Sequence, residues 1–223
     1  MKQMKRRIKK AGAALAGICT LLLAGCGGQN PLYEMQDAMT KMSEKEASFE
    51  KEQGALQSYE KKEQQLYKKM IQTTKDHTKT VSNLSDQALA SAEKREEHLK
   101  TEKDSMDQSK KEFQSVKEFA EQIKDAEVRD KAEQTVKSIE KRYASYDQLY
   151  REYQKALKQD KHLYESLKRK DLGYAELKSK LKTVNRSYSK VRKESKKFNQ
   201  YTDQLNEYKQ ALYKTAQKES QNS

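Results

Sequence analysis

Residues that usually build active sites are scarce in this sequence. Its 223 residues include seven glycines, three histidines and no tryptophan. It contains no glycine-rich phosphate loop, no nucleophile elbow and no paired-histidine zinc motif. The histidines, His77, His98 and His162, lie far apart among charged residues without the spacing of metal ligands, so we expect all three at the surface. The sequence therefore predicts neither an enzyme nor a metal site, and it indicates no cofactor.

A hydrophobic run long enough to cross a membrane is also lacking. Residues 11–23 are uncharged and mostly apolar, and they follow six basic residues, which is the order of a secretory signal peptide. A spanning helix needs about 20 apolar residues, so this run is too short for an ordinary membrane anchor.

The run ends in four residues that resemble the lipobox of bacterial lipoproteins: Leu23, Ala24, Gly25 and Cys26. The resemblance implies that diacylglycerol is transferred to the Cys26 sulfur and that the chain is cleaved before this residue. We therefore expect a signal peptide at residues 1–25 and a lipidated cysteine with a short tether at residues 26–30. Two or more acyl chains, at about 0.8 kcal/mol per buried CH₂, would anchor the chain on the outer face of the cytoplasmic membrane, facing the cell wall. The alternative is an uncleaved signal anchor with an incidental cysteine.

Free thiols are absent from the expected mature chain. Cys19 lies in the segment that is removed, and acylation consumes the Cys26 sulfur. No disulfide can then form, so thiol redox chemistry is excluded.

Apolar residues other than alanine, methionine and tyrosine are few. Leu, Ile, Val and Phe make up 28 of the 198 residues after the signal peptide, below the roughly one-fifth that usually marks a globular core. Basic side chains outnumber acidic ones there by 41 to 34, because residues 1–25 hold six basic residues and no acidic one. Composition alone would permit disorder, but the periodicity of the sequence argues against it.

Large apolar residues recur at spacings of three, four or seven along four stretches, which is the pattern of amphipathic helices. The expected elements are, in order, a helix over residues 31–75, a turn over 76–83, a helix over 84–123, a third helix capped by Asp125, a reversal over 169–173, a fourth helix beginning near Tyr174, and a polar tail over 217–223. A narrow apolar stripe must face other helices to leave water. We therefore predict an all-α fold for one domain over residues 31–216, an elongated up-and-down bundle of about four long helices with coiled-coil-like packing. A longer two- or three-stranded coiled coil is the alternative.

Individual residues refine this prediction. Asn30 is expected to cap the first helix, with Pro31 in its first turn. Gly54 is expected to be the weak point of that helix, and Gly173 to take a left-handed conformation at the reversal. Arg95 interrupts the apolar stripe of the second helix, so we expect loose packing around it.

Carboxylates and tyrosines are plentiful, and we expect them in different places. The carboxylates of residues 44–51 and 60–69 have lysine neighbours three or four positions away, which predicts solvated faces with modest ion-pair support. Ten of the 13 tyrosines lie at or after Tyr143, and most fall on stripe positions. Stacking on sugar rings is one interpretation, but core filling with the hydroxyl at the edge is the one we prefer.

Basic residues concentrate toward the C-terminus. Residues 161–223 hold 16 basic and 7 acidic side chains, whereas residues 26–160 hold 25 and 27. Six of these basic residues form the candidate binding site for an anionic polymer: Lys178, Lys182, Arg186, Lys190, Lys193 and Lys197. On an exported protein, such a field attracts phosphate-rich envelope polymers or anionic lipid headgroups. The alternative is a solvated face, and nucleic acid is discounted as a partner because the signal peptide takes the chain away from it.

The lipobox, the single early proline, the lysine-rich 198 residues and the four helical stretches together resemble the YkyA-type cell-wall-binding lipoproteins of Gram-positive bacteria. The resemblance covers the whole chain. It implies a helical bundle on the outer membrane face with wall association, and it supplies no catalytic residues. Two functions remain open, both without catalysis. One is binding of peptidoglycan or a teichoic-acid-like anionic polymer through the basic C-terminal helix; the other is a helical scaffold or spacer that holds another envelope protein.

Overall fold

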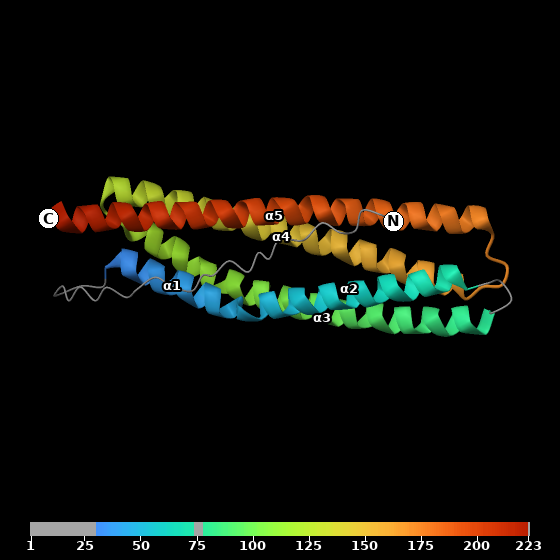
Figure 1. The fold of residues 1–223 in the computed structure, drawn as a ribbon. Coiled ribbons are helices and arrows are strands. Elements are labelled where there is room, and N and C mark those ends of the chain that lie inside the picture. The colour runs from blue at the N-terminus through green and yellow to red at the C-terminus, as the bar shows by residue number, and fades with distance from the viewer. Residues whose placement is uncertain (1–29, 74–77, 223) are drawn as a thin grey trace. The chain divides into compact units, whose positions relative to one another are not determined.

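A computed structural model describes residues 30–73 and 78–222, and nearly all of them are helical. The helices are α1 (Pro31–Lys45), α2 (Ala47–Gln72), α3 (Thr78–Gln122), α4 (Ala126–Leu167) and α5 (Tyr174–Asn222) (Figure 1). The predicted all-α bundle of long helices is confirmed. The described helices pack as a bundle rather than as the longer two- or three-stranded coiled coil of the alternative. Over the described residues, no helix is long and apolar enough to cross a membrane.

The helix starts follow the residues that were expected to cap them. The Asn30 side chain accepts a hydrogen bond from the Leu32 N–H at 3.0 Å, and Pro31 is the first residue of α1. The Asp125 carboxylate likewise accepts from the Val128 N–H at 2.8 Å at the start of α4. Both caps satisfy backbone donors that the first turn of a helix leaves without a partner.

The prediction of one helix over residues 31–75 is wrong, because the chain breaks at Glu46. The Glu46 backbone has φ −86° and ψ 1°, and its N–H donates to the carbonyls of both Met42 and Ser43, which ends α1. Gly54, the expected weak point, lies inside α2 without interrupting it. The break therefore follows from what Glu46 contacts rather than from helix propensity.

Two other boundaries differ from the prediction, whereas α5 begins at Tyr174 as expected. α3 begins at Thr78, within the expected turn, and α5 continues to Asn222 through most of the expected polar tail. Gly173 does not take a left-handed conformation. Its carbonyl instead accepts from the Leu177 N–H at 3.0 Å, so this residue directly precedes α5 and lies at its N-terminus rather than at the end of α4.

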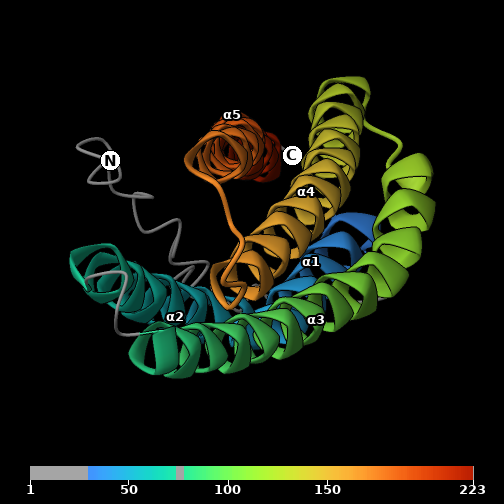
Figure 2. The ribbon, with the colours of Figure 1, turned by 90° about the vertical axis from the view of Figure 1, so that its right-hand side faces the viewer.

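The described residues pack as two compact units, each built from parts of the long helices. Unit 1 comprises residues 30–50, 105–145 and 197–222, and unit 2 comprises residues 51–73, 78–104 and 146–196. In unit 2, α2 and the first half of α3 run side by side (Figures 1 and 2).

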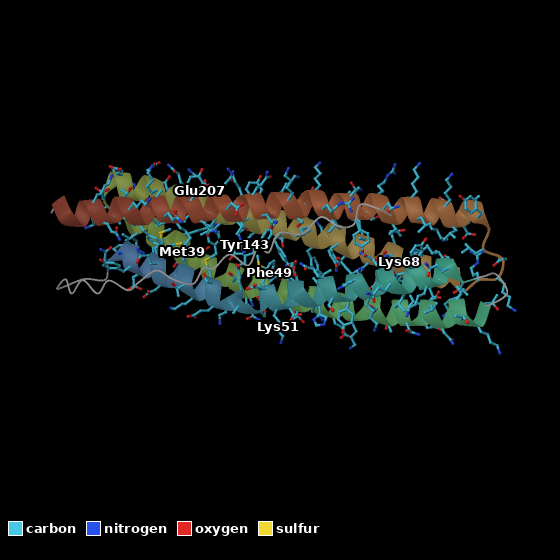
Figure 3. The ribbon with its side chains drawn as sticks, in the orientation of Figure 1. Met39, Phe49, Lys51, Lys68, Tyr143 and Glu207 are labelled. Atoms are coloured by element: carbon cyan, nitrogen blue, oxygen red, sulfur yellow. The ribbon has the colours of Figure 1, made fainter. Side chains whose placement is uncertain are left out.

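Each unit has its own core. In unit 1, Met39, Phe49 and Tyr143 are buried between helices, whereas Glu207 lies exposed on the outer side (Figure 3). Buried tyrosines recur along α4, at Tyr143, Tyr146, Tyr153 and Tyr164. The expected core-filling role of the α4 tyrosines is therefore confirmed, and these four rings are not available to stack on sugars.

Candidate binding face and buried charge clusters

One face of α5 in unit 2 carries five basic side chains that point to solvent: Lys178, Lys182, Arg186, Lys190 and Lys193. We call these five residues the basic face. Their spacing of four, four, four and three positions keeps them on one side of the helix, about 6 Å apart along its axis where the spacing is four. The opposite side of the same segment holds its apolar residues, from Leu177 to Val191.

Acidic side chains offset this face only weakly: Glu152 of α4, which hydrogen-bonds to Lys155, also attracts Lys190, but it forms no salt bridge with that residue. Within residues 174–196 the acidic residues are Glu176 and Glu194, and Glu194 is buried. Glu176 forms salt bridges with Arg169 at 2.8 Å and Lys180 at 3.5 Å. Over the described part of the chain, none of the five cations of the basic face has a salt-bridge partner.

Two other parts of the predicted site lie elsewhere. Lys197, the sixth candidate cation, is partly buried and belongs to unit 1, so we do not include it in the basic face. The lipobox residues Leu23, Ala24, Gly25 and Cys26 lie outside the described residues.

A buried cluster of charged and hydroxyl groups lies at the centre of unit 2. Arg95 of α3 is only 2% exposed, and its Nη2 donates to an Asp160 carboxylate oxygen at 2.6 Å and to the Tyr188 hydroxyl at 2.8 Å. Tyr188 in turn donates to the same Asp160 oxygen. The second carboxylate, Glu63 of α2, lies 3.4 Å from Arg95 Nε and accepts from the Tyr164 hydroxyl at 3.0 Å.

This cluster holds two carboxylates against one guanidinium. Burial raises the pKa of Glu63 to about 7, and the attraction of Arg95 only partly offsets that effect. Burial also raises the pKa of Asp160, although Arg95 and Tyr188 both favour its charged form. Asp160 has the closer guanidinium contact, so Glu63 is the surplus acid of the cluster.

Another buried carboxylate in unit 2 has no such cation. Glu102 is 1% exposed, and its two oxygens accept from the Tyr146 hydroxyl at 2.9 Å and from the Gln53 side-chain amide. Burial raises the pKa of Glu102 to about 7, and the nearby Glu52 carboxylate raises it further. Glu52 itself lies 2.5 Å from the His98 Nδ1.

In unit 1, a bidentate ion pair connects Glu46, at the break between α1 and α2, to Arg142 of α4. The Arg142 guanidinium donates to both Glu46 oxygens, at 2.8 and 2.6 Å, and to the Thr202 hydroxyl at 3.2 Å. Ser109 also donates to Glu46, at 2.8 Å. Burial lowers the pKa of Lys209 to about 8, an effect that Arg142 strengthens and Glu46 opposes. Paired planar groups of this kind fix orientation as well as contributing energy.

Several of these charged residues were expected in other surroundings. Glu63 is buried and the Glu46 side chain is only 9% exposed, so neither is solvated as expected, and Arg95 belongs to a closely hydrogen-bonded cluster rather than a loosely packed one. The sequence does contain a signal for two of them. Glu63 falls seven residues after Leu56, and Arg95 falls three after Ala92, so both occupy stripe positions.

The histidines give no sign of metal binding. His162 is exposed as expected, whereas His98 is only partly exposed and contacts Glu52, which corrects the expectation for that residue. His77 lies outside the described residues. Across residues 30–73 and 78–222, no group of His, Cys, Asp and Glu side chains is arranged to hold a metal ion.

Residues 30–215 match the family model of YkyA, whose description reads "Putative cell-wall binding lipoprotein". The chain belongs to the YkyA family. The protein called "Uncharacterized lipoprotein YkyA" of Bacillus subtilis (strain 168) is 41% identical over 216 residues, which cover 96% of this chain and 97% of that protein. The resemblance seen in the sequence is thus confirmed, and membership of a lipoprotein family supports a membrane-anchored location at the cell surface.

A crystal structure at 1.6 Å of a conserved protein of unknown function from Staphylococcus aureus has a similar fold. The TM-score is 0.61, and the match covers 84% of this chain and 98% of the other. At 18% sequence identity this likeness concerns the fold alone. The helical bundle of this chain is therefore shared with a protein of low sequence identity.

Proposed function

We propose that the chain is a non-enzymatic lipoprotein that binds an anionic polymer of the cell wall through the basic face of α5. The signal peptide at residues 1–25, the lipid on Cys26 and the tether at residues 26–30 would hold it on the outer face of the cytoplasmic membrane. The wall then lies within reach of the bundle. The observation that carries the proposal is the row of five solvent-exposed cations without salt-bridge partners.

The spacing of the basic face suits a repeating polyanion better than an isolated ion. Lysine and arginine side chains that are not paired within the protein can each approach a different phosphate along a flexible chain. Every such contact is weak and is screened by salt, since the Debye length is only about 8 Å at physiological ionic strength. A teichoic-acid-like polymer fits this chemistry, and uncharged glycan strands of peptidoglycan fit it less well.

The test is co-sedimentation of a Cys26→Ser protein with isolated walls, before and after removal of their anionic polymers, at low and high salt. The triple variant Lys182→Glu, Arg186→Glu, Lys190→Glu removes the centre of the basic face. We expect wall binding to fall by at least about tenfold, since each basic residue near an anionic surface contributes about 1 kcal/mol.

A matched control changes the same net charge on another helix of unit 2. Lys61, Lys62 and Lys68 of α2 are exposed, and their triple replacement by glutamate should leave most of the binding intact. Equal losses in the two variants would show attraction to net charge alone. Binding that survives polymer removal and high salt would contradict the proposal.

A second candidate, a scaffold that holds another envelope protein, is favoured by one observation. Leu177, Leu181 and Val184 on the inner side of α5 are only partly buried, and Tyr174 is 81% exposed. Binding through such apolar groups would tolerate salt and would fail on substitution of these residues rather than of the lysines.

A further inference from the structure

The first part of α5 is packed much more thinly than the rest of that helix. None of residues 174–190 is fully buried, and the first buried side chains of α5 are Val191 and Glu194. Further along the same helix, in unit 1, Phe198, Leu205 and Leu212 are all buried. We call residues 174–190 the arm; it is the orange beginning of α5 in Figure 1.

One side chain of the arm hydrogen-bonds to the buried charges of unit 2, and Lys190 adds an electrostatic attraction to Glu152 of α4. Tyr188 accepts a hydrogen bond from Arg95 at 2.8 Å and donates one to Asp160, and the Arg95 guanidinium lies 5.9 Å from the centre of its ring. Among the described residues, no other side chain of the arm hydrogen-bonds to α2, α3 or α4. The apolar contribution to holding the arm is small, because its apolar side chains stay partly in water.

We propose that the arm is a movable segment latched by Tyr188, and that it opens and closes as the net charge of the buried Arg95 cluster changes. The inference goes beyond the proposed function, because it concerns the free protein and requires no ligand. It also gives the buried cluster a role that stability does not explain, since replacing such a cluster by apolar side chains often stabilises a protein.

Glu63 is the group whose ionisation changes that net charge. The titratable and charged groups around it come from all four helices of unit 2: Glu60 of α2, Arg95 of α3, Tyr153, Asp160 and Tyr164 of α4, and Tyr188 of α5. Burial raises the pKa values of all three tyrosines, so they remain neutral hydrogen-bond donors. With Asp160 and Arg95 both charged, the cluster is neutral when Glu63 is protonated and negative when it is ionised.

The direction of the switch follows from the cost of burying a charge. Protonated Glu63 leaves a neutral Arg95–Asp160 pair to which Tyr188 is bonded, so the arm is closed. Ionised Glu63 adds a buried charge that no cation compensates. Water can hydrate this charge most easily at the arm, where packing is thinnest, so the arm opens. The pKa of Glu63 is about 7 in the closed state and returns toward its ordinary 4.5 once water enters, so the arm opens as pH rises through about 7.

Hydrogen exchange of the full chain, corrected for the intrinsic effect of pH, tests the inference. Between pH 6 and pH 8 we expect the protection of the arm to fall by about tenfold. Over this interval Glu63 is more fully ionised in the open state than in the closed state, and this difference shifts the equilibrium toward the open state by about a factor of ten. Protection of α4 in residues 146–167 serves as the internal reference, because ionisation of Glu102 changes the stability of the folded state over the same pH range.

Three variants separate the latch from its surroundings. Tyr188→Phe removes the hydroxyl and should bring the low protection seen at pH 8 to pH 6 as well. Glu63→Gln fixes the cluster in its neutral state and should abolish the pH dependence with the arm closed. Tyr174→Phe is the matched control, because this exposed tyrosine of the same arm makes no hydrogen bond in the described structure.

Two results would overturn the inference. One is an arm that is as protected as α4 at both pH values, and the other is an arm whose exchange is the same in Tyr188→Phe and the wild type. If Tyr188→Phe unfolds, loss of protection throughout α4 will reveal it. The comparison of Glu63→Gln with the wild type then tests the inference, because it asks whether the pH dependence of the arm requires Glu63. Wall binding is not measured here, so failure of the latch and failure of the proposed polymer binding remain distinguishable.

Discussion

A carboxyl group on the packed side of a helix stays protonated at pH values at which an exposed carboxyl group is ionised. Glu102 is the clearest example, because its two hydrogen bonds come from neutral donors, Tyr146 and Gln53, and no cation shares the site with it. Hydrogen bonds to a charged acceptor recover only part of the solvation that is lost on burial. The residue therefore makes the folded state sensitive to pH.

The variant Glu102→Gln should stabilise the protein at pH 8 and change little at pH 5. The pKa of Glu102 is about 7 when folded and 4.5 when unfolded, so the wild-type residue favours folding at low pH and loses that contribution as pH rises to 7. Glutamine keeps the acceptor for Tyr146 and cannot ionise, and Gln53 can rotate its amide to present its oxygen. We expect a gain on the order of 3 kcal/mol at pH 8, measured by urea denaturation.

The same comparison at pH 5 is the control, since both carboxyl and amide are then neutral in the folded state. An equal gain at both pH values would point to packing rather than ionisation. A loss of stability at pH 8 would show that the charged form of Glu102 is the one the fold requires.

At the level of helices, the break at Glu46 shows how a contact can outweigh propensity. Glutamate is a good helix former and Gly54 is a poor one, yet the helix ends at the first and continues through the second. The two hydrogen bonds from Arg142 hold the Glu46 side chain near α4, and the chain turns there to allow it. Gly54 has no comparable tertiary contact that would bend the helix, because nothing lies within 4 Å of the position that a Cβ would take.

Gly54→Ala should therefore stabilise α2 by about 1 kcal/mol, because alanine has the higher helix propensity and reduces the freedom of the unfolded chain. Gly54 is exposed and helical, so the added methyl group costs no packing. A rise in the thermal midpoint of the intact chain would check this result. An unchanged or lowered midpoint would mean that the glycine serves some contact that the structure does not show.

Helix boundaries set by local chemistry could be predicted from the sequence, and those set by distant contacts could not. Asn30 and Asp125 cap their helices through neighbours two or three residues away, so reading the sequence sufficed. Glu46 pairs with Arg142, which lies 96 positions further along, and no local pattern signals that partner. The basic face was predictable because a solvated helix face needs only its own periodicity, whereas Tyr188 was assigned to a stripe without any indication of the cluster beneath it.

At the level of the whole molecule, the expected lipid site and the excess of basic residues lie in different parts of the chain. The expected lipid site is Cys26, at the start of the mature protein, and the basic face lies more than 150 residues further on, in α5. Between them the chain is nearly neutral, with 25 basic and 27 acidic side chains over residues 26–160. The expected lipid site and the proposed polymer-binding face can therefore be tested separately by substitution.

Cys26→Ser should abolish incorporation of labelled palmitate and move the protein from the membrane fraction to the soluble fraction or the medium. The thioether requires the Cys26 sulfur, and the 13-residue apolar run before the lipobox is too short to span a membrane, where about 20 residues are needed. Cys19→Ser is the matched control, because that thiol lies in the segment expected to be removed. It should leave both labelling and fractionation unchanged.

The opposite pattern would favour the uncleaved signal anchor. In that case both serine variants would stay with the membrane, neither they nor the wild type would take up palmitate, and the mature chain would retain residues 1–25 by mass. Because the basic face is intact in Cys26→Ser, the released protein should still sediment with walls that carry their anionic polymers. Release from the membrane together with retained wall binding would establish that the lipid anchors the protein and that wall binding does not require it.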